Sequence, residues 1–139
     1  MYRKILLAAD GSAHSLRAAD QAIIVSKGNK EAMIVVLYVV DTDTLKDDVM
    51  RYREKEAIAE HRLKKLAAIE EKVQEAGVDY EIKIIHGEPG PAIVDYANDN
   101  KCDVVFIGSR GLNTFQEFIL GSVSHKVAKR ANCPVMIVK

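Results

Sequence analysis

Residues 104–124 read VVFIGSRGLNTFQEFILGSVS and contain the features that decide the fold. The first four residues are an apolar run of the kind found in strands that are covered on both faces. Gly108 and Gly111 then permit a turn in which backbone N–H groups come close to a ligand. Nine residues further on, Gly121 and Ser122 are typical of the start of a helix. The segment therefore predicts a buried strand and, after a loop, a helix whose N-terminus faces the end of that strand.

Four other runs are typical of strands, and segments with helical period separate them. One of these runs alternates, with Ile82 and Ile84 placed between Glu81 and Lys83, which is typical of an edge strand. The other runs are apolar at nearly every position, as in strands with both faces covered. The expected strands are residues 5–9, 33–40, 80–85, 104–107 and 135–138.

Helix starts and ends are marked by serine, proline and glycine. Ser12 or Ser15 can cap the first helix, and Gly28 ends it. Gly77 ends a long charged helix, and Pro91 suits the first turn of the next one. The last three expected helices are residues 46–76, a helix that begins near residue 91, and residues 122–131.

The resulting order, β-α-β-α-β-α-β-α-β, predicts one α/β domain over residues 1–139. Right-handed crossovers turn this alternation into a doubly wound, Rossmann-like parallel sheet with helices on both faces. A chain of 139 residues can bury a core without metal or disulfides. In such sheets ligands bind beyond the carboxyl ends of the strands, so that edge of the sheet is the expected place of the site.

Composition removes several classes of function. The chain is 48% apolar and its 20 basic residues equal its 20 acidic ones, so it has no overall field that attracts nucleic acid or an anionic membrane. The longest apolar stretch, residues 32–40, is far below the roughly 20 residues of a membrane-spanning helix. Cys102 and Cys133 form no Cys-x-x-Cys pair and no secretory leader precedes them, so we expect reduced thiols in a cytoplasmic protein.

The strand ends carry the candidate binding residues. A helix N-terminus that starts with Gly121 and is flanked by the hydroxyls of Ser122 and Ser124 is well suited to phosphate. Arg110 adds a mobile cation at the rim. Either glycine motif alone can serve only a turn or a helix cap. Their joint occurrence at the favoured edge of the sheet favours a phosphate site.

Asp10, at the end of the first strand, has several open roles. It can form a turn, act as an acid, bind magnesium, or accept a hydrogen bond from a base or ribose. Only Asp41 is a second carboxylate at these strand ends, so we expect no metal held by the protein alone, and any Mg²⁺ to arrive on nucleotide phosphates.

The histidines and the charge runs predict no catalytic residue. The four histidines show neither zinc spacing nor a nucleophile partner, and His61 is expected on a solvated helix face. His125 can approach a phosphate or lie on the surface. The charge runs between residues 46 and 75 are interpreted as a water-facing helix surface.

These residues together resemble the ATP-binding branch of the universal stress protein family. The resemblance rests on Gly-Ser-Arg-Gly at residues 108–111 followed, after nine residues, by Gly-Ser-Val-Ser, and on Asp10-Gly11-Ser12, Val39-Val40-Asp41 and Cys133-Pro134-Val135. It covers the whole chain. It implies the sheet order 3-2-1-4-5 and an adenine nucleotide (ATP, ADP or AMP) across the ends of strands 1 and 4.

The resemblance also implies a role for each site residue. Asp10 and Val39 would contact the adenosine, with Ala8 and Ala9 forming a wall. The ribose and first phosphate would lie along Gly108, Arg110 and Gly111, and the phosphate chain on Gly121, Ser122, Val123 and Ser124. His125 stands where relatives commonly have an acidic residue, and its charge could alter phosphate affinity below about pH 6.5.

A homodimer is implied as well. Residues Pro134 to Val138 would form an apolar edge strand, and exposed edges of this kind are usually covered. Pairing of the same strand across a two-fold axis would cover it.

Three functions are compatible with these observations. The leading one is a cytoplasmic, dimeric ATP-binding stress or signalling protein, in which the nucleotide changes the surface offered to an unidentified protein partner. The second is a slow ATPase or a phosphotransferase that phosphorylates itself at Ser122 or Ser124. The third is a nucleotide-free dimeric scaffold. No Gly-Lys-Ser phosphate loop and no Gly-x-Gly-x-x-Gly fingerprint is present.

Overall fold

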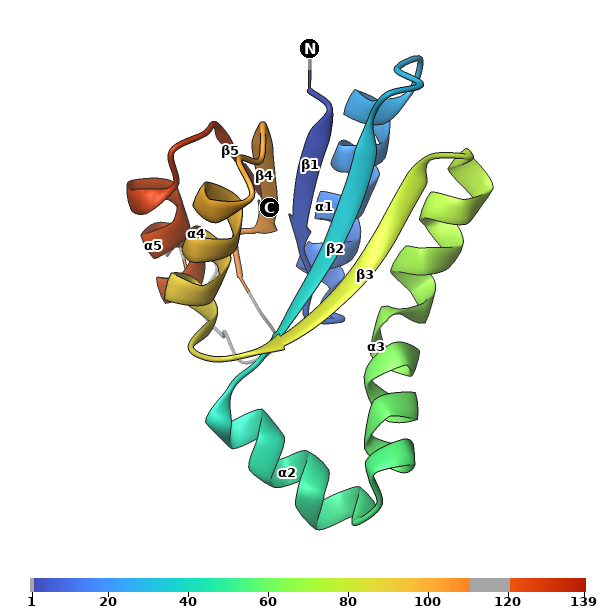
Figure 1. Ribbon diagram of the computed structural model, residues 1–139, viewed down its shortest axis with the longest axis vertical. Coiled ribbons are helices and arrows are strands. Elements are labelled where there is room, and N and C mark those ends of the chain that lie inside the picture. Colours follow the sequence, from blue (N-terminus) through green and yellow to red (C-terminus); the bar gives the residue numbers. More distant parts are fainter. Residues whose placement is uncertain (1, 111–120) are drawn as a thin grey trace.

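Five parallel strands form one sheet in the computed structural model, which describes residues 2–110 and 121–139. The strand order is β3-β2-β1-β4-β5, which confirms the doubly wound fold and the expected order (Figure 1). The elements are β1 (Lys4–Ala8), α1 (Ala13–Ser26), β2 (Met33–Val40), α2 (Thr42–Tyr52), α3 (Lys55–Ala76), β3 (Asp79–His86), α4 (Pro89–Asp99), β4 (Val104–Gly108), α5 (Ser122–Arg130) and β5 (Val135–Val138).

Two apolar clusters cover the two faces of the sheet. Because successive side chains of a strand point to opposite faces, Ile5 and Leu7 of β1 belong to one cluster and Leu6 to the other. The first cluster packs against α1 and α3, and the second against α4 and α5, which lie together on one side in Figure 1. The expected helices on both faces are therefore present.

The prediction of one long helix over residues 46–76 is wrong, because the structure has two helices in this part of the chain. The helix α2 begins earlier than predicted because Asp41 caps it, its carboxylate accepting a hydrogen bond from the N–H of Thr44 at 2.8 Å. The helix ends at Arg53, whose φ of 52° lies in the left-handed region. The chain then turns back into α3, so α2 and the first turns of α3 form an arm below the sheet, and the rest of α3 runs up beside the sheet (Figure 1).

Charged side chains join α2 to α3 in this arm. Asp48 of α2 pairs with Arg62 of α3 at 3.2 Å, and the two side chains are only 4% and 11% exposed. Beside them Tyr52 stacks on His61 and its hydroxyl lies 3.0 Å from the Nδ1 atom of that ring. Two expectations are thereby corrected, because neither the charge runs nor His61 lie only on a solvated surface. A buried Asp48 without its partner would cost several kcal/mol, so the pair with Arg62 matters where α2 and α3 meet.

The end of α3 offers a direct test of backbone strain. Gly77 has a φ of 70° and a side chain there would meet open space, so only the left-handed backbone opposes a larger residue. We expect Gly77→Ala to lower the free energy of unfolding by about 1 kcal/mol. Gly77→Asn should lose roughly half of that, because asparagine adopts this conformation more readily. Urea unfolding measures both, and an Ala variant as stable as the wild type would contradict the prediction.

The two edges of the sheet differ. The strand β3 lies at one edge, as its alternating pattern predicts, and β5 lies at the other. In the single chain β5 is only half buried, and Met136 is 46% exposed. Within residues 2–110 and 121–139, no strand pairs with the outer edge of the apolar strand β5.

Both cysteines are free thiols in the second apolar cluster. Burial raises the pKa of Cys102 to about 11, and it also raises the pKa of Cys133. Because the thiolate is the reactive form, these pKa shifts keep both sulfurs in the unreactive thiol form at neutral pH.

Candidate functional site

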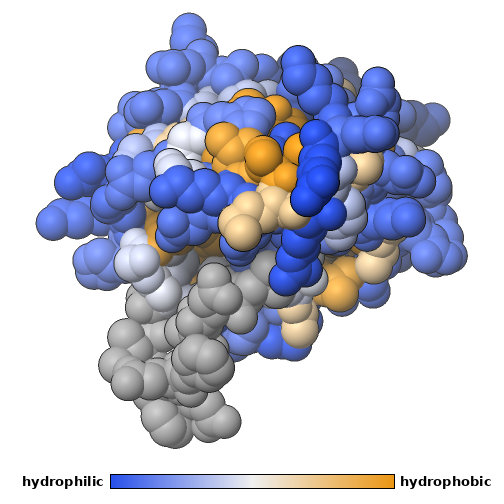
Figure 2. Space-filling view, turned by 90° about the horizontal axis from the view of Figure 1, so that it is seen from below, coloured by the Kyte–Doolittle hydropathy of each residue, from blue (hydrophilic) through white to orange (hydrophobic). Residues whose placement is uncertain are grey.

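A pocket of about 420 Å³ lies at the carboxyl ends of β1, β2 and β4. Figure 2 views the molecule from this end and shows a mostly hydrophilic face with a few apolar side chains gathered in it. Ten of the eleven predicted site residues line the pocket: Ala8, Ala9, Asp10, Val39, Gly108, Arg110, Gly121, Ser122, Val123 and Ser124. The eleventh, Gly111, lies outside the described residues.

The start of α5 supplies the donors of the site. Gly121 is its N-cap, and its own N–H donates to the carbonyl of Ser109 at 2.8 Å. Ser122, Val123 and Ser124 form the first turn of α5. Their N–H groups have no acceptor within the helix, because no carbonyl precedes them at the required position. Together with the positive end of the helix dipole, three such donors beside a pocket favour an anion.

The hydroxyl of Ser124 has a structural role in addition to its predicted one. It is buried, and its single hydrogen is shared between the carbonyls of Ser109, at 3.1 Å, and of Gly121, at 3.0 Å. Ser122 is exposed and lines the pocket. Of the two hydroxyls predicted to hold phosphate, the one of Ser122 is thus the more accessible.

Ser109 joins three elements at this edge. Its N–H donates to the carbonyl of Val138 in β5 at 2.7 Å, and its carbonyl accepts the bond from Gly121. Its hydroxyl lies 3.3 Å from the Nδ1 atom of His14 in α1. The sequence therefore missed one Ser–His contact, although neither residue lines the pocket.

Gly108 brings β4 against the start of α1. A Cβ atom at this position would lie 2.6 Å from the Cβ atom of His14 and 3.0 Å from its carbonyl carbon. Real atoms do not approach so closely, so the contact requires glycine. The absence of a side chain at Gly108 also keeps this wall of the pocket flat.

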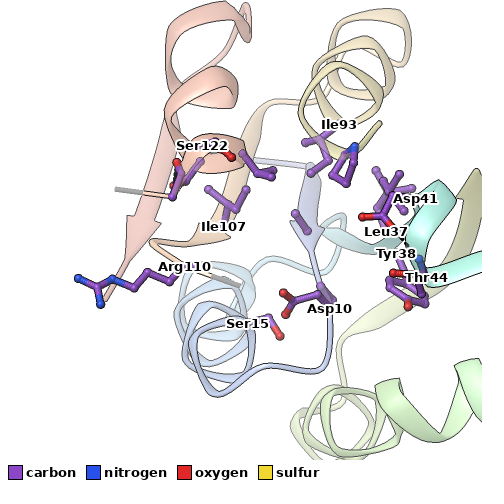
Figure 3. A pocket seen from close by; sticks show the side chains of 18 of the residues that line it. Asp10, Ser15, Leu37, Tyr38, Asp41, Thr44, Ile93, Ile107, Arg110 and Ser122 are labelled. Atoms are coloured by element: carbon purple, nitrogen blue, oxygen red, sulfur yellow. Dashed lines mark hydrogen bonds between the residues drawn. The ribbon is translucent and has the colours of Figure 1, made fainter. Parts of the chain in front are cut away.

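Asp10 lies in the middle of the pocket. Its Oδ1 atom accepts a hydrogen bond from the N–H of Ser12 at 2.9 Å, which forms the turn after β1. Figure 3 places Asp10 between Ser122 on one side and Tyr38 and Thr44 on the other. Its second carboxylate oxygen has no protein partner among the described residues, so it can accept a hydrogen bond from a ligand.

The acidic groups of the site do not form a metal centre. Asp41 also lines the pocket, but its Oδ1 atom caps α2. No group of three or more His, Cys, Asp or Glu side chains that could hold a metal occurs within residues 2–110 and 121–139.

The guanidinium of Arg110 lies away from the expected phosphate position (Figure 3), and His125 takes the surface position, one of the two that the sequence left open. Arg110 lines the pocket, but Figure 3 shows its guanidinium group extending away from Asp10 and Ser122. Its Nη2 atom is buried and makes no hydrogen bond within the part of the chain that the structure describes. His125 is exposed on α5 and does not line the pocket.

Lys65 is the main site residue that the sequence did not indicate. It belongs to α3, within the charge runs interpreted as a solvated surface, and it reaches the pocket together with Tyr38 and Thr44. Its Nζ atom donates to the Tyr38 hydroxyl at 3.2 Å. No pattern in the sequence could have separated Lys65 from its neighbours, because its position depends on how α3 docks on the sheet.

Comparison with known proteins gives one consistent result. The model of the universal stress protein family matches residues 1–139. Universal stress protein YxiE of Bacillus subtilis is 36% identical over 154 aligned positions that cover all of both chains. Universal stress protein MJ0531 of Methanocaldococcus jannaschii is 32% identical, over 100% of this chain and 83% of its own.

Solved structures show the same similarity. The hypothetical protein MJ0577 has a TM-score of 0.84 at 30% identity, over 100% of this chain and 96% of its own. A universal stress protein solved in complex with cAMP has a TM-score of 0.72 at 27% identity, over 99% and 96% of the two chains. One from Arabidopsis thaliana, solved with AMP bound, has a TM-score of 0.70 at 26% identity, over 99% and 91%.

Proposed function

The chain belongs to the universal stress protein family, and from this premise we propose that it binds an adenine nucleotide in the pocket at the ends of β1 and β4. In this proposal the nucleotide is ATP, or its products ADP or AMP. The protein acts as a cytoplasmic dimer whose nucleotide state changes the surface offered to a partner.

The arrangement of donors and acceptors carries the proposal. The N–H groups of the first turn of α5 would hold phosphate oxygens, and the free carboxylate oxygen of Asp10 would accept a hydrogen bond from the adenosine. Ala8, Ala9 and Val39 supply apolar surface between them. A volume of about 420 Å³ lies within the usual range of small-molecule pockets.

The nucleotides bound by two structural neighbours support the chemical class. One is described in complex with cAMP and the other with AMP bound, and both share an adenine, a ribose and a phosphate. Any Mg²⁺ would arrive with the phosphates of ATP, because Asp10 and Asp41 are too few to hold it alone.

The uncovered edge of β5 supports the dimer. This strand is apolar and half buried, and in the part of the chain that the structure describes it pairs with β4 alone. Pairing of Pro134 to Val138 with a second copy would satisfy its open backbone groups and cover Met136.

The decisive experiment measures nucleotide in the purified protein. The protein is denatured, and the released nucleotide is separated and quantified. The same preparation is then exchanged with labelled ATP, with GTP as the competitor. We expect close to one adenine nucleotide per chain and displacement by ATP. The absence of bound nucleotide together with no measurable ATP affinity would refute the proposal.

Sedimentation analysis of the wild type and Met136→Lys tests the dimer. Lysine would place a charge on the apolar edge, so we expect the wild type to sediment as a dimer and the variant as a monomer with nucleotide still bound. A monomeric wild type would refute the dimer without affecting the nucleotide site.

A further inference from the structure

The ammonium group of Lys65 is an unexpected part of the pocket. Lys65 is the only residue of α3 that lines it. Its Nζ atom donates to the hydroxyl of Tyr38 at 3.2 Å and lies 5.6 Å from the centre of that ring. Within the described residues it forms no ion pair. The preceding residue, Lys64, instead lies 4.0 Å from Glu60 and is 75% exposed.

The backbone holds Lys65 beside the turn that contains Asp10. A Cβ atom on Gly11 would lie 3.2 Å from the carbonyl oxygen of Lys65, so α3 packs directly on this turn. Gly11 also has a φ of 81°, which suits glycine and fixes the direction in which the chain leaves Asp10. The acceptor Asp10 and the donor Lys65 are therefore positioned by the same contact.

Lys65 contacts the side of the pocket that is remote from the start of α5, where the phosphates are proposed to bind. Tyr38, the partner of Lys65, lies on the opposite side of the pocket from Ser122 at the start of α5 (Figure 3). If the donors of α5 hold phosphate, the part of a nucleotide that reaches Tyr38 and Lys65 is the base. Adenine offers ring nitrogens N1, N3 and N7, which only accept hydrogen bonds, and an exocyclic amino group, which donates them.

We propose that Lys65 is a specificity-determining residue of this site, whose ammonium donates a hydrogen bond to a ring nitrogen of the purine. Asp10 accepts from the exocyclic amino group. An ammonium can only donate and an ionised carboxylate can only accept, so the pair matches an adenine edge that carries one acceptor and one donor. The inference rests on the proposed function, because it assigns the base end of the same nucleotide site.

The test compares the wild type with Lys65→Met by calorimetric titration of ATP, 1-deaza-ATP and 7-deaza-ATP. Each analogue lacks one ring nitrogen. For the wild type, we expect one analogue to bind about tenfold more weakly than ATP, the loss of one charge-assisted hydrogen bond. The Lys65→Met protein should bind ATP more weakly than the wild type by a similar factor. It should bind ATP and the analogue that the wild type binds weakly with equal affinity, because the hydrogen bond that distinguishes them is already lost. Lys64→Met is the matched control and should leave all three affinities unchanged.

Two further measurements exclude a merely structural or long-range role. Lys65→Gln keeps a donor without the charge and should bind ATP with intermediate affinity. The Lys65→Met substitution should lower the affinity for adenosine by the same factor as the affinity for ATP, because the lost hydrogen bond goes to the base, which both ligands share. A larger loss for ATP, or an equal loss for every analogue, would overturn the inference.

Different results would overturn the role of Lys65 and the nucleotide site itself. ATP binding that Lys65→Met leaves unchanged overturns the role of Lys65 alone. A wild type that binds no ATP overturns the proposed function and the inference with it.

Discussion

Gly108→Ala is expected to lower the free energy of unfolding by about 3 kcal/mol, the cost of forcing a methyl group into a packed core. The new Cβ atom would lie 2.6 Å from the Cβ atom of His14 and 3.0 Å from its backbone carbonyl carbon. Neither atom can move unless α1 moves away from β4. Because Gly108 also lines the pocket, ATP affinity should fall in the same variant. Urea unfolding and ATP titration measure the two effects.

Gly90→Ala is the matched control for crowding. The new Cβ atom there would meet only the side chain of Lys126, at 2.9 Å from its Cδ atom, and that flexible chain can turn aside. We expect the free energy of unfolding of this variant to lie within about 1 kcal/mol of the wild type. Equal stability of Gly108→Ala and Gly90→Ala would show that the contact with His14 does not require glycine.

Gly121→Val is expected to weaken ATP binding by about 100-fold, as the loss of one or two charge-assisted hydrogen bonds would. A branched side chain at the N-cap would lie beside the N–H groups of Ser122 and Val123, where a phosphate must approach. Its Cβ atom would also lie 3.2 Å from the carbonyl of Ser109, which binds the N–H of the same residue. Calorimetric titration measures the change in affinity.

Ser122→Ala provides the comparison at the same end of the pocket. It keeps every N–H group of the first turn and removes one exposed hydroxyl, so we expect a loss of only about fivefold. Urea unfolding must show that Gly121→Val is folded. ATP hydrolysis is measured on the same samples, since an ATPase would lose turnover in this variant. Unchanged ATP affinity in a folded Gly121→Val protein would place the phosphates elsewhere.

The layout of the site could be predicted because it follows from topology. Parallel strands end at one edge, so Asp10, Val39 and Gly108 lie close together once β2 and β4 are placed on either side of β1. The spacing between Gly111 and Gly121 then indicated the start of α5. The strand order depended on the family resemblance, because periodicity alone does not order strands.

The arm of α2 and α3 could not be predicted in the same way. Helical period continues through residues 46–76, and no glycine or proline marks the break at Arg53. The two helices on either side of the break are joined by the pairing of Asp48 with Arg62, residues 14 positions apart, and a periodicity along the chain does not show such a contact. Lys65 was missed for the same reason: only the docked α3 shows that it reaches the pocket.

The backbone hydrogen bonds of Ser109 limit which substitutions this position can accept. The N–H of this residue donates to β5 and its carbonyl accepts from the N–H of Gly121, so the backbone groups of one residue join β5 to the start of α5. Every residue except proline carries both groups. A substitution at position 109 by any residue except proline therefore keeps both backbone groups of this connection, although it removes the contact of the hydroxyl with His14.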